Sequence, residues 1–486
     1  MKLSSGSTEG GPPLPPSPSH RPSVGEGDAK VKAEGASRNC RGRGRRSASC
    51  GSFGTMEFDK FPRSIGAHRM QLKTILNRVE KYKSFVYGKA RFGKKGGRLT
   101  LSVSVRPRKG SRGECSGCGQ RGPQYDRQPA RRFEFVPLWG MAVYFVYCMR
   151  RVDCPRCGVK VERVPWAKGR CRLTTTYRWF LAAWGKRMAW QEVANVFHTS
   201  WQSVYRSVRY AVLWGVVHRK WGKIKALGID EIAWQKGHKY LTLVYQIDEG
   251  RKRLLWIGRE RTEESLRRFF RILPRKVARG IGFVCSDMWQ PYLTVIAESL
   301  SKAVHVLDRF HVMSHFSKAI DEIRAGESRQ LKQDGYEPIL KHSRWCLLKR
   351  PENLTAKQVV KLAELVKYNL QSVRAYLLKE EFQRFWEYVA PFWAVRFLDE
   401  WCTRTMRSRL EPMKRVARML REHRPLLRNW FRARGTISAG VVEGFNNKAK
   451  LTTKKAYGFR TYNAIEIALY HQLGALPEPK FTHSFW

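Results

Sequence analysis

Acidic residues are scarce in this chain of 486 residues, which has 40 Asp and Glu against 93 Lys and Arg and a formal net charge of +53. Long apolar runs are missing too: no stretch of about 18 uncharged apolar residues occurs, so no membrane span is expected. The N-terminal residues lack the hydrophobic core of a secretion signal. No fixed-period repeat is present, which argues against a solenoid. We therefore expect a cytoplasmic protein with reduced thiols.

The positive excess indicates a polyanionic partner, and DNA or RNA is the first candidate. A ribosome-associated or membrane-associated basic protein is the alternative. Hydrophobic residues make up 42% of the chain, which is enough for folded cores and excludes disorder throughout. At roughly 100–200 residues per domain, the length predicts about three domains.

Residues 1–69 are of low complexity, with a Pro- and Ser-rich stretch and the basic run RGRGRRS. Neither part can bury a core, so we predict a disordered extension. It is either a phosphate-binding arm or the product of an upstream start assignment, with Met56 or Met70 as the true start. Regular patterning begins at Met70.

Four cysteines form two C-x2-C-Gly motifs with the pattern C-x2-C-x35-C-x2-C. Two thiolates from each turn can complete a tetrahedral zinc site, and the glycine after each second cysteine permits the tight turn. We predict structural Zn²⁺ in a zinc ribbon over residues 70–172, with Cys115, Cys118, Cys154 and Cys157 as ligands. Four unrelated buried or redox thiols are the alternative.

A helical pattern over residues 173–222 contains a three-residue turn, residues 198–200, between two helices. We predict a DNA-binding helix-turn-helix whose recognition helix covers residues 201–212. A plain helical hairpin is the alternative. The side chains predicted to face DNA are Gln202, Ser203, Arg206 and Arg209, and those predicted to pack inside are Val193, Ala194, Val196, Val204 and Val208.

From residue 223 onward the pattern predicts an α/β fold with a mixed sheet. Three successive strands with short turns suit antiparallel pairing, and a helix, a strand, a helix and a last strand follow. Residues 314–435 are helical by their i, i+3, i+4, i+7 periodicity. A final helix is expected over residues 442–473.

Three carboxylates on separate elements attract attention in so basic a chain. Asp230 lies in the first predicted strand, Asp287 ends the fourth, and Glu443 begins the last helix. Three converging carboxylates can bind two Mg²⁺ ions (or Mn²⁺), which is the arrangement that phosphodiester chemistry uses. Taken singly, Asp287 could be only a helix N-cap and Glu443 only a surface charge.

Other polar residues compete for the site. Asp308, at the end of the fifth strand, is a secondary metal-ligand candidate, or it caps the next helix. His311 and His315 imitate a metal pair at i and i+4, but without a HExxH frame a phosphate or structural role is favoured. Glu231 follows Asp230 in a strand and should face the other side of the sheet.

A basic cluster follows the third acid and could hold substrate phosphates, although a solvated helix face is the alternative. Its predicted DNA-binding members are Asn446, Asn447, Lys448, Lys450, Lys454, Lys455 and Arg460. In the helical region, Trp386, Trp393 and Trp401 could stack on bases, but core packing is the favoured role.

These stretches together resemble the DDE transposases of bacterial insertion sequences, of the ISL3 type. The resemblance covers about residues 70–475 and rests on CPRCG, the helix-turn-helix, LGIDEIAWQKGHKYLTLVYQID, VCSDMWQPY, HVLDRFHV and SAGVVEGFNNKAKLTTKKAYGFRTY. It implies a ribonuclease-H-like catalytic domain over residues 223–315 and 436–486, interrupted by an all-helical insertion over residues 316–435. It also implies that the triad is Asp230, Asp287 and Glu443.

The resemblance further implies what the protein does. It would bind the terminal inverted repeats of its element, cleave the element ends and join the 3′-hydroxyls to target DNA. A homo-oligomer in the synaptic complex, no membrane partner, and a bacterial, nucleoid-associated location are expected. An inactive DNA-binding regulator and a nuclease without strand transfer are the alternatives.

Overall fold

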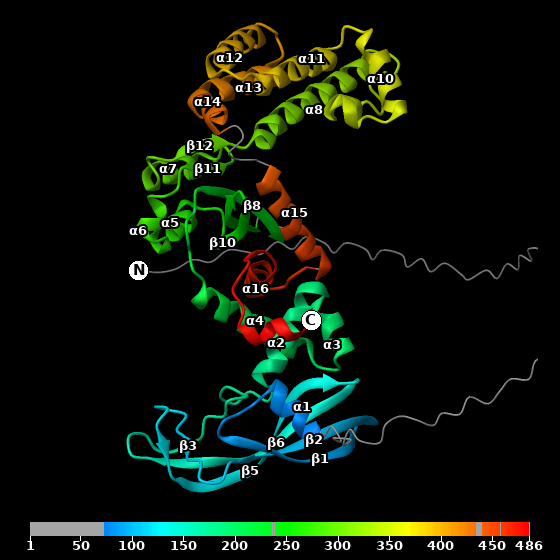
Figure 1. Cartoon of the computed structure of the whole chain (residues 1–486). Coiled ribbons are helices and arrows are strands. Elements are labelled where there is room, and N and C mark those ends of the chain that lie inside the picture. The colour runs from blue at the N-terminus through cyan, green and yellow to red at the C-terminus, as the bar shows by residue number, and fades with distance from the viewer. Residues whose placement is uncertain (1–71, 236, 238, 434–439, 457, 486) are drawn as a thin grey trace, which may run out of the picture. The chain divides into compact units, whose positions relative to one another are not determined.

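The computed structural model describes residues 72–485, apart from 236, 238, 434–439 and 457. The predicted disordered extension therefore lies outside the described residues. Figure 1 labels the helices and strands. Within the described ranges, no helix is both long and apolar enough to cross a membrane.

The first described module consists of α1 (Leu72–Val79), β1 (Phe85–Lys95), β2 (Arg98–Pro107), β3 (Gly113–Glu114), β4 (Arg121–Gly122), β5 (Gln124–Leu138), β6 (Met141–Cys154) and β7 (Gly158–Val161). Its main sheet has the order β1-β2-β6-β5, and β7 also pairs with β6. Buried Trp166 anchors the core, with its ring 5.9 Å from that of Phe133 and 5.4 Å from that of Tyr147. The short β3–β4 hairpin and the β6–β7 turn carry the cysteine pairs.

Three helices follow, α2 (Thr175–Arg187), α3 (Trp190–Val196) and α4 (Trp201–His218). Ser200 begins α4 as its N-cap, because its hydroxyl accepts a hydrogen bond of 3.1 Å from the amide of Ser203. The helix continues beyond the predicted end at residue 212. One predicted core residue is wrong: the Val196 side chain is 53% exposed, and Phe197 packs against the core instead.

The α/β region contains β8 (Ala226–Gln235), β9 (Lys239–Asp248), β10 (Arg251–Arg259), α5 (Glu263–Ile272), α6 (Arg275–Ala278), β11 (Phe283–Ser286), α7 (Gln290–Ser299) and β12 (Val304–Leu307). The sheet order is β10-β9-β8-β11-β12. The first three strands pair antiparallel, while β11 is parallel to both β8 and β12. The mixed sheet predicted from the sequence is therefore confirmed.

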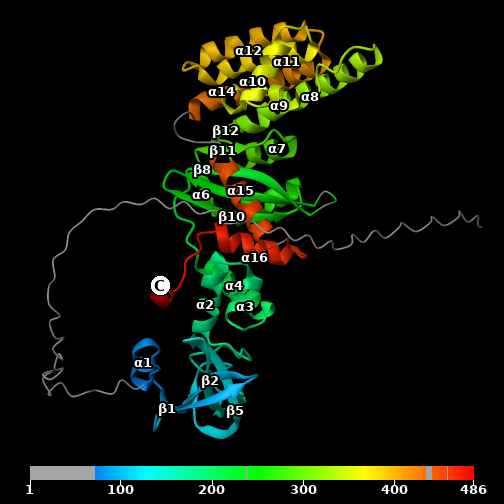
Figure 2. The ribbon, with the colours of Figure 1, turned by 90° about the vertical axis from the view of Figure 1, so that its right-hand side faces the viewer.

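Both faces of this sheet are covered, because alternate residues of the central strands are apolar on each side. Leu227 and Ile229 of β8 pack in the core beneath α5 and α7. Ala226 and Ile232 point to the other core, which includes α15 (Gly440–Lys455) and α16 (Tyr462–Leu473). Figures 1 and 2 show α15 beside β8.

The predicted single helix over residues 442–473 is wrong, because α15 and α16 are separate helices. A new N-cap begins α16: the hydroxyl of Thr461 accepts a hydrogen bond of 3.3 Å from the amide of Ala464. The break lets α16 contact both β10 and α4 (Figure 2), which one continuous helix along α15 could not do.

The remaining helices pack around a buried aromatic core, which extends to Leu293 of α7 and Leu307 of β12. The rings of Phe316 and Trp401 lie 5.5 Å apart, and the indole of Trp401 donates a 3.0 Å hydrogen bond to the carbonyl of Leu378. Trp386 is buried too, as core packing predicts, whereas Trp393 is exposed. The elements are α8 (Arg309–Gln333), α9 (Arg344–Leu348), η1 (Pro351–Asn353), α10 (Ala356–Val366), α11 (Gln371–Gln383), η2 (Arg384–Glu387), α12 (Pro391–Met406), α13 (Glu411–Glu422) and α14 (Arg424–Ala433), while η3 (Lys480–Phe485) ends the described chain. The long helix α8 thus crosses the predicted boundary at residue 316.

Candidate active site

Three buried carboxylates lie at one edge of the mixed sheet. Asp230 is in β8, Asp287 follows β11 and Asp308 follows β12, and these three neighbouring strands run parallel. The strands β11 and β12 both end at this level of the sheet, and the pairing of Cys285 with Gly228 sets Asp230, inside β8, level with Asp287. The three residues are only 5%, 8% and 5% exposed. Buried carboxylates this close together need hydrogen bonds or cations to offset the cost of removing them from water.

Asp230 is held by the backbone and by α15. Its Oδ1 accepts a 2.7 Å hydrogen bond from the amide of Glu231, and its Oδ2 accepts one from the side-chain amide of Asn446. Asn446 in turn accepts a 3.1 Å hydrogen bond from the hydroxyl of buried Tyr245. Burial raises the pKa of Asp230, while the charge of His311 and the two hydrogen bonds oppose that rise.

Helix α15 lies close to β8 because Gly228 has no side chain. A Cβ at Gly228 would approach Val442 Cγ2 to 2.7 Å, so any larger residue would push the helix outward. Phe445 stacks on Tyr245 with ring centroids 4.6 Å apart. This packing brings exposed Glu443, in the first turn of α15, within electrostatic reach of the site: burial raises the pKa of Asp308, and the charges of Asp230 and Glu443 raise it further.

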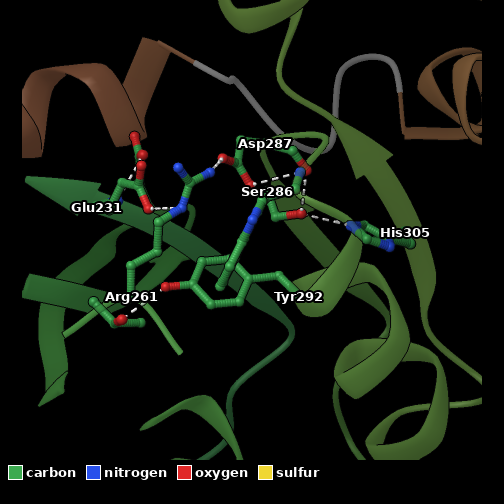
Figure 3. Close-up of polar contacts among 9 residues, drawn as sticks. Glu231, Arg261, Ser286, Asp287, Tyr292 and His305 are labelled. Atoms are coloured by element: carbon green, nitrogen blue, oxygen red, sulfur yellow. Dashed lines mark hydrogen bonds and ion pairs between the residues drawn. The ribbon is translucent and has the colours of Figure 1, made fainter. Parts of the chain in front are cut away.

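A guanidinium that the sequence did not single out bridges two acids, as Figure 3 shows. Arg261 Nε lies 2.5 Å from Glu231 Oε2, and Arg261 Nη2 lies 3.2 Å from Asp287 Oδ2. The guanidinium also stacks over the ring of Trp289, 4.4 Å from its centroid. Burial raises the pKa of Glu231 to about 7, with Arg261 opposing the rise. No motif around Arg261 in the sequence points to this role.

A second network of hydrogen bonds holds the residues at the end of β11 in place (Figure 3). The hydroxyl of Ser286 donates a 2.8 Å hydrogen bond to the carbonyl of Asp287 and lies 2.8 Å from His305 Nε2. The amide of Trp289 donates a 3.2 Å hydrogen bond to Asp287 Oδ1. Asp287 is thereby fixed at the start of α7, where its carboxylate also pairs with Arg261.

A mixed cluster of donors forms around Asp230. One ligand atom each from Asp230, Asp308 and His311 lie within 4.8 Å of one another. Asp308 also caps α8, because its Oδ1 accepts a 2.9 Å hydrogen bond from the amide of Phe310. Of the predicted triad, only Asp230 belongs to this cluster. His311 belongs to it too, although the sequence analysis favoured a phosphate or structural role for this residue.

The two predicted cysteine pairs do meet. One sulfur atom from each of Cys115, Cys118, Cys154 and Cys157 lies within 4.8 Å of all the others. Gly119 and Gly158 have φ angles of +78° and +67°, the left-handed conformation that glycine after each pair permits. Four converging thiols are the donor set that suits zinc.

The predicted recognition helix presents its polar face to solvent. In α4 the side chains of Gln202, Arg206 and Arg209 are exposed, and Ser203 is half-buried beside the N-cap. Val204 and Val208 are buried on the opposite face, as predicted.

The basic cluster after Glu443 divides into buried and exposed parts. Asn446 is 8% exposed and binds Asp230 and Tyr245, so its amide is not free to contact DNA. The exposed members are Asn447, Lys448, Lys450, Lys454, Lys455 and Arg460. Three of these lysines line a cavity of about 1590 Å³, which also has Trp190 of α3 in its wall. The residues that line this cavity do not include Asp230, Asp287, Asp308 or Glu443.

The mixed sheet, the converging acids and the sulfur cluster define an α/β protein with two groups of side chains that could hold metal ions. Residues 227–469 match the model of the ISL3-type DDE transposases, described as transposases. The chain is 32% identical over 349 residues to the transposase of insertion sequence IS1001 from Bordetella parapertussis, covering 71% of this chain and 85% of that protein. It is 29% identical over 395 residues to the transposase of IS1557 from Mycobacterium tuberculosis, covering 74% and 86%.

The chain therefore belongs to the ISL3-type DDE transposases. Membership implies an enzyme that cuts and transfers DNA with the help of divalent metal ions. The resemblance noted in the sequence is confirmed.

Proposed function

We propose that this protein binds the terminal inverted repeats of an insertion sequence, cleaves the element ends and joins them to target DNA. The observation that supports the proposal is that α15, which carries Glu443, packs against β8, which carries Asp230. The charge of Asp287 acts on Asp230, and the charge of Glu443 acts on Asp308. The strand order β10-β9-β8-β11-β12, with three antiparallel strands followed by two parallel ones, supports a ribonuclease-H-like catalytic domain.

We assign Asp230, Asp287 and Glu443 as the residues that hold catalytic Mg²⁺ or Mn²⁺, since carboxylate oxygens suit these ions. Bound there, divalent ions supply Lewis acidity and activate a water or a 3′-hydroxyl. Asn446 is a positioning residue that fixes Asp230 against α15. Arg261 forms an ion pair with Asp287, so an ion bound at Asp287 would compete with this guanidinium.

The reaction has two displacements at phosphorus. Water oxygen first bonds to the phosphorus at the element end, and the bond from phosphorus to the 3′-oxygen breaks, which leaves a 3′-hydroxyl. That hydroxyl then bonds to a target phosphorus as the target's own 3′-oxygen leaves. No covalent protein intermediate forms.

DNA would be bound by three parts of the chain. The cysteine cluster would hold structural Zn²⁺ and stabilise a zinc ribbon, and Arg206 and Arg209 of α4 would read the terminal repeat. The exposed lysines of α15 would contact phosphates near the acids. Because two element ends must be joined together, we propose a homo-oligomer in the synaptic complex, located with the bacterial nucleoid.

The direct test uses labelled element ends and a target plasmid with the purified full chain. Asp230→Asn, Asp287→Asn and Glu443→Gln should each abolish cleavage and joining while end binding persists. Glu249→Gln, at an exposed acid in the β9–β10 turn, is the matched control and should remain active. Full joining by any triad variant would remove that residue from the triad.

The same assay separates the alternatives. Specific end binding by the wild-type chain without metal-dependent cleavage would identify a DNA-binding regulator. Cleavage without joining of pre-cleaved ends would identify a nuclease. Either result would overturn the proposed strand transfer.

A further inference from the structure

We propose that Asp308 and His311 bind a divalent ion together with Asp230, and that the imidazole makes this ion Mn²⁺ in preference to Mg²⁺. The inference rests on the proposed function for its role in catalysis, but it concerns two residues outside the triad. It adds a nitrogen ligand to a site that the triad would build from oxygen alone.

The geometry places the three donors together from two neighbouring elements. Asp230 comes from β8, and Asp308 and His311 from the start of α8, with one ligand atom of each within 4.8 Å of the other two. Asp308 is the N-cap of α8, so its position is fixed by the helix backbone. One helical turn fixes His311 relative to it, because residues i and i+3 lie on the same face.

The two buried carboxylates of this cluster, Asp230 and Asp308, favour the binding of a cation between them. Within the residues that the structure describes, neither Asp230 nor Asp308 forms an ion pair with Arg or Lys. Asp287, in contrast, is paired with Arg261. Two carboxylates that are 95% buried and this close repel each other, and leaving them unpaired is costly. A divalent cation between them would offset both the repulsion and the lost hydration.

The chemistry of His311 decides which cation. Mg²⁺ prefers oxygen ligands and holds its waters firmly, whereas an imidazole nitrogen suits the first-row transition metals. Among the two ions that support phosphodiester chemistry in an oxygen-rich site, a nitrogen ligand therefore favours Mn²⁺. The alternative role for His311 is that of a protonated counter-ion for the two carboxylates, with no bond to metal.

The test measures Mn²⁺ binding to the zinc-loaded full chain without DNA, by calorimetry and by electron spin echo spectroscopy of bound Mn²⁺. We expect one Mn²⁺ to show coupling to a nitrogen nucleus, and His311→Ala to abolish that coupling. Asp308→Asn and His311→Ala should each weaken Mn²⁺ binding at least about tenfold. Loss of a residue that only supports a metal ligand already costs about that much affinity, and loss of a direct ligand should cost no less. The ratio of Mn²⁺ to Mg²⁺ affinity should fall in His311→Ala.

Matched variants separate ligand loss from misfolding. Asparagine at position 308 retains an oxygen that can cap α8, so Asp308→Asn should keep its helix content. His315→Ala changes the histidine one turn further along α8 and should leave both Mn²⁺ affinity and nitrogen coupling unchanged. Unchanged Mn²⁺ affinity in Asp308→Asn or His311→Ala, or no nitrogen coupling in the wild type, would overturn the inference.

The two proposals can fail separately. A chain that joins DNA but shows no nitrogen coupling would retain the proposed function and lose this metal site. A chain that binds Mn²⁺ through nitrogen but never joins DNA would retain the site and lose the function.

Discussion

The side-chain amide of Asn446 should be the main polar attachment of α15 to the mixed sheet, and Asn446→Ala tests this. The substitution removes a hydrogen bond to a buried carboxylate, worth about 1.5–3 kcal/mol. It also leaves the buried hydroxyl of Tyr245 without its acceptor, at a cost of about 1–3 kcal/mol. Together we expect a loss of about 3 kcal/mol in local stability, which is roughly a 150-fold rise in the opening equilibrium.

Asn447→Ala is the natural control, because the neighbouring side chain is exposed. Exposed substitutions of this kind change stability by about 0.5 kcal/mol or less. Hydrogen exchange of backbone amides in α15 and β8 measures local opening directly, without assuming that the whole chain unfolds in one step. Strand transfer should also fall in Asn446→Ala, since α15 carries Glu443.

Tyr245→Phe gives an intermediate case. It removes the hydroxyl but leaves the bond between Asn446 and Asp230, so its effect on exchange should lie between those of the two alanine variants. If Asn446→Ala and Asn447→Ala give the same exchange rates and the same strand transfer, the attachment of α15 through Asn446 is refuted.

Three further predictions concern pH, zinc and DNA. Burial lowers the pKa of His305 from 6.5 to about 4, so the unfolded chain binds a proton at this residue more tightly than the folded chain does. The contribution of neutral His305 to the stability of the β12 region is therefore complete above pH 6.5, and about 2 kcal/mol of it is lost at pH 5. Hydrogen exchange should show this loss in the wild type but not in His305→Gln, and equal pH slopes would count against it. The Cys154→Ser variant should no longer bind stoichiometric zinc and should bind element ends more weakly. The control Cys148→Ser, at an exposed thiol outside the cluster, should keep both zinc and end binding. Full zinc content in Cys154→Ser would disprove the site. Arg209→Ala should lower the slope of end binding against salt by about 1 if its side chain contacts a phosphate, and an unchanged slope would exclude that contact.

Features that depend on local pattern could be predicted from the sequence. The glycines after each cysteine pair select the left-handed turns that aim the sulfurs inward, and those turns are where the pattern puts them. The strands carrying Asp230 and Asp287 were also found, because alternating and continuous apolar runs separated by turns are local signals. The prediction of a single helix over residues 442–473 was wrong, because the pattern of apolar residues did not reveal the break between α15 and α16.

By itself the sequence determined the family, the order of the sheet strands and the acids in or just after those strands, since each is encoded in residues close together along the chain. Only the tertiary structure decided the surroundings of those acids. It placed Asn446 against Asp230 and left Asn447 in solvent, brought Arg261 onto Asp287, and set His311 beside Asp230 and Asp308. The physical reason is that these contacts join residues far apart in sequence, and packing of a helix against the sheet selects which side chains are buried.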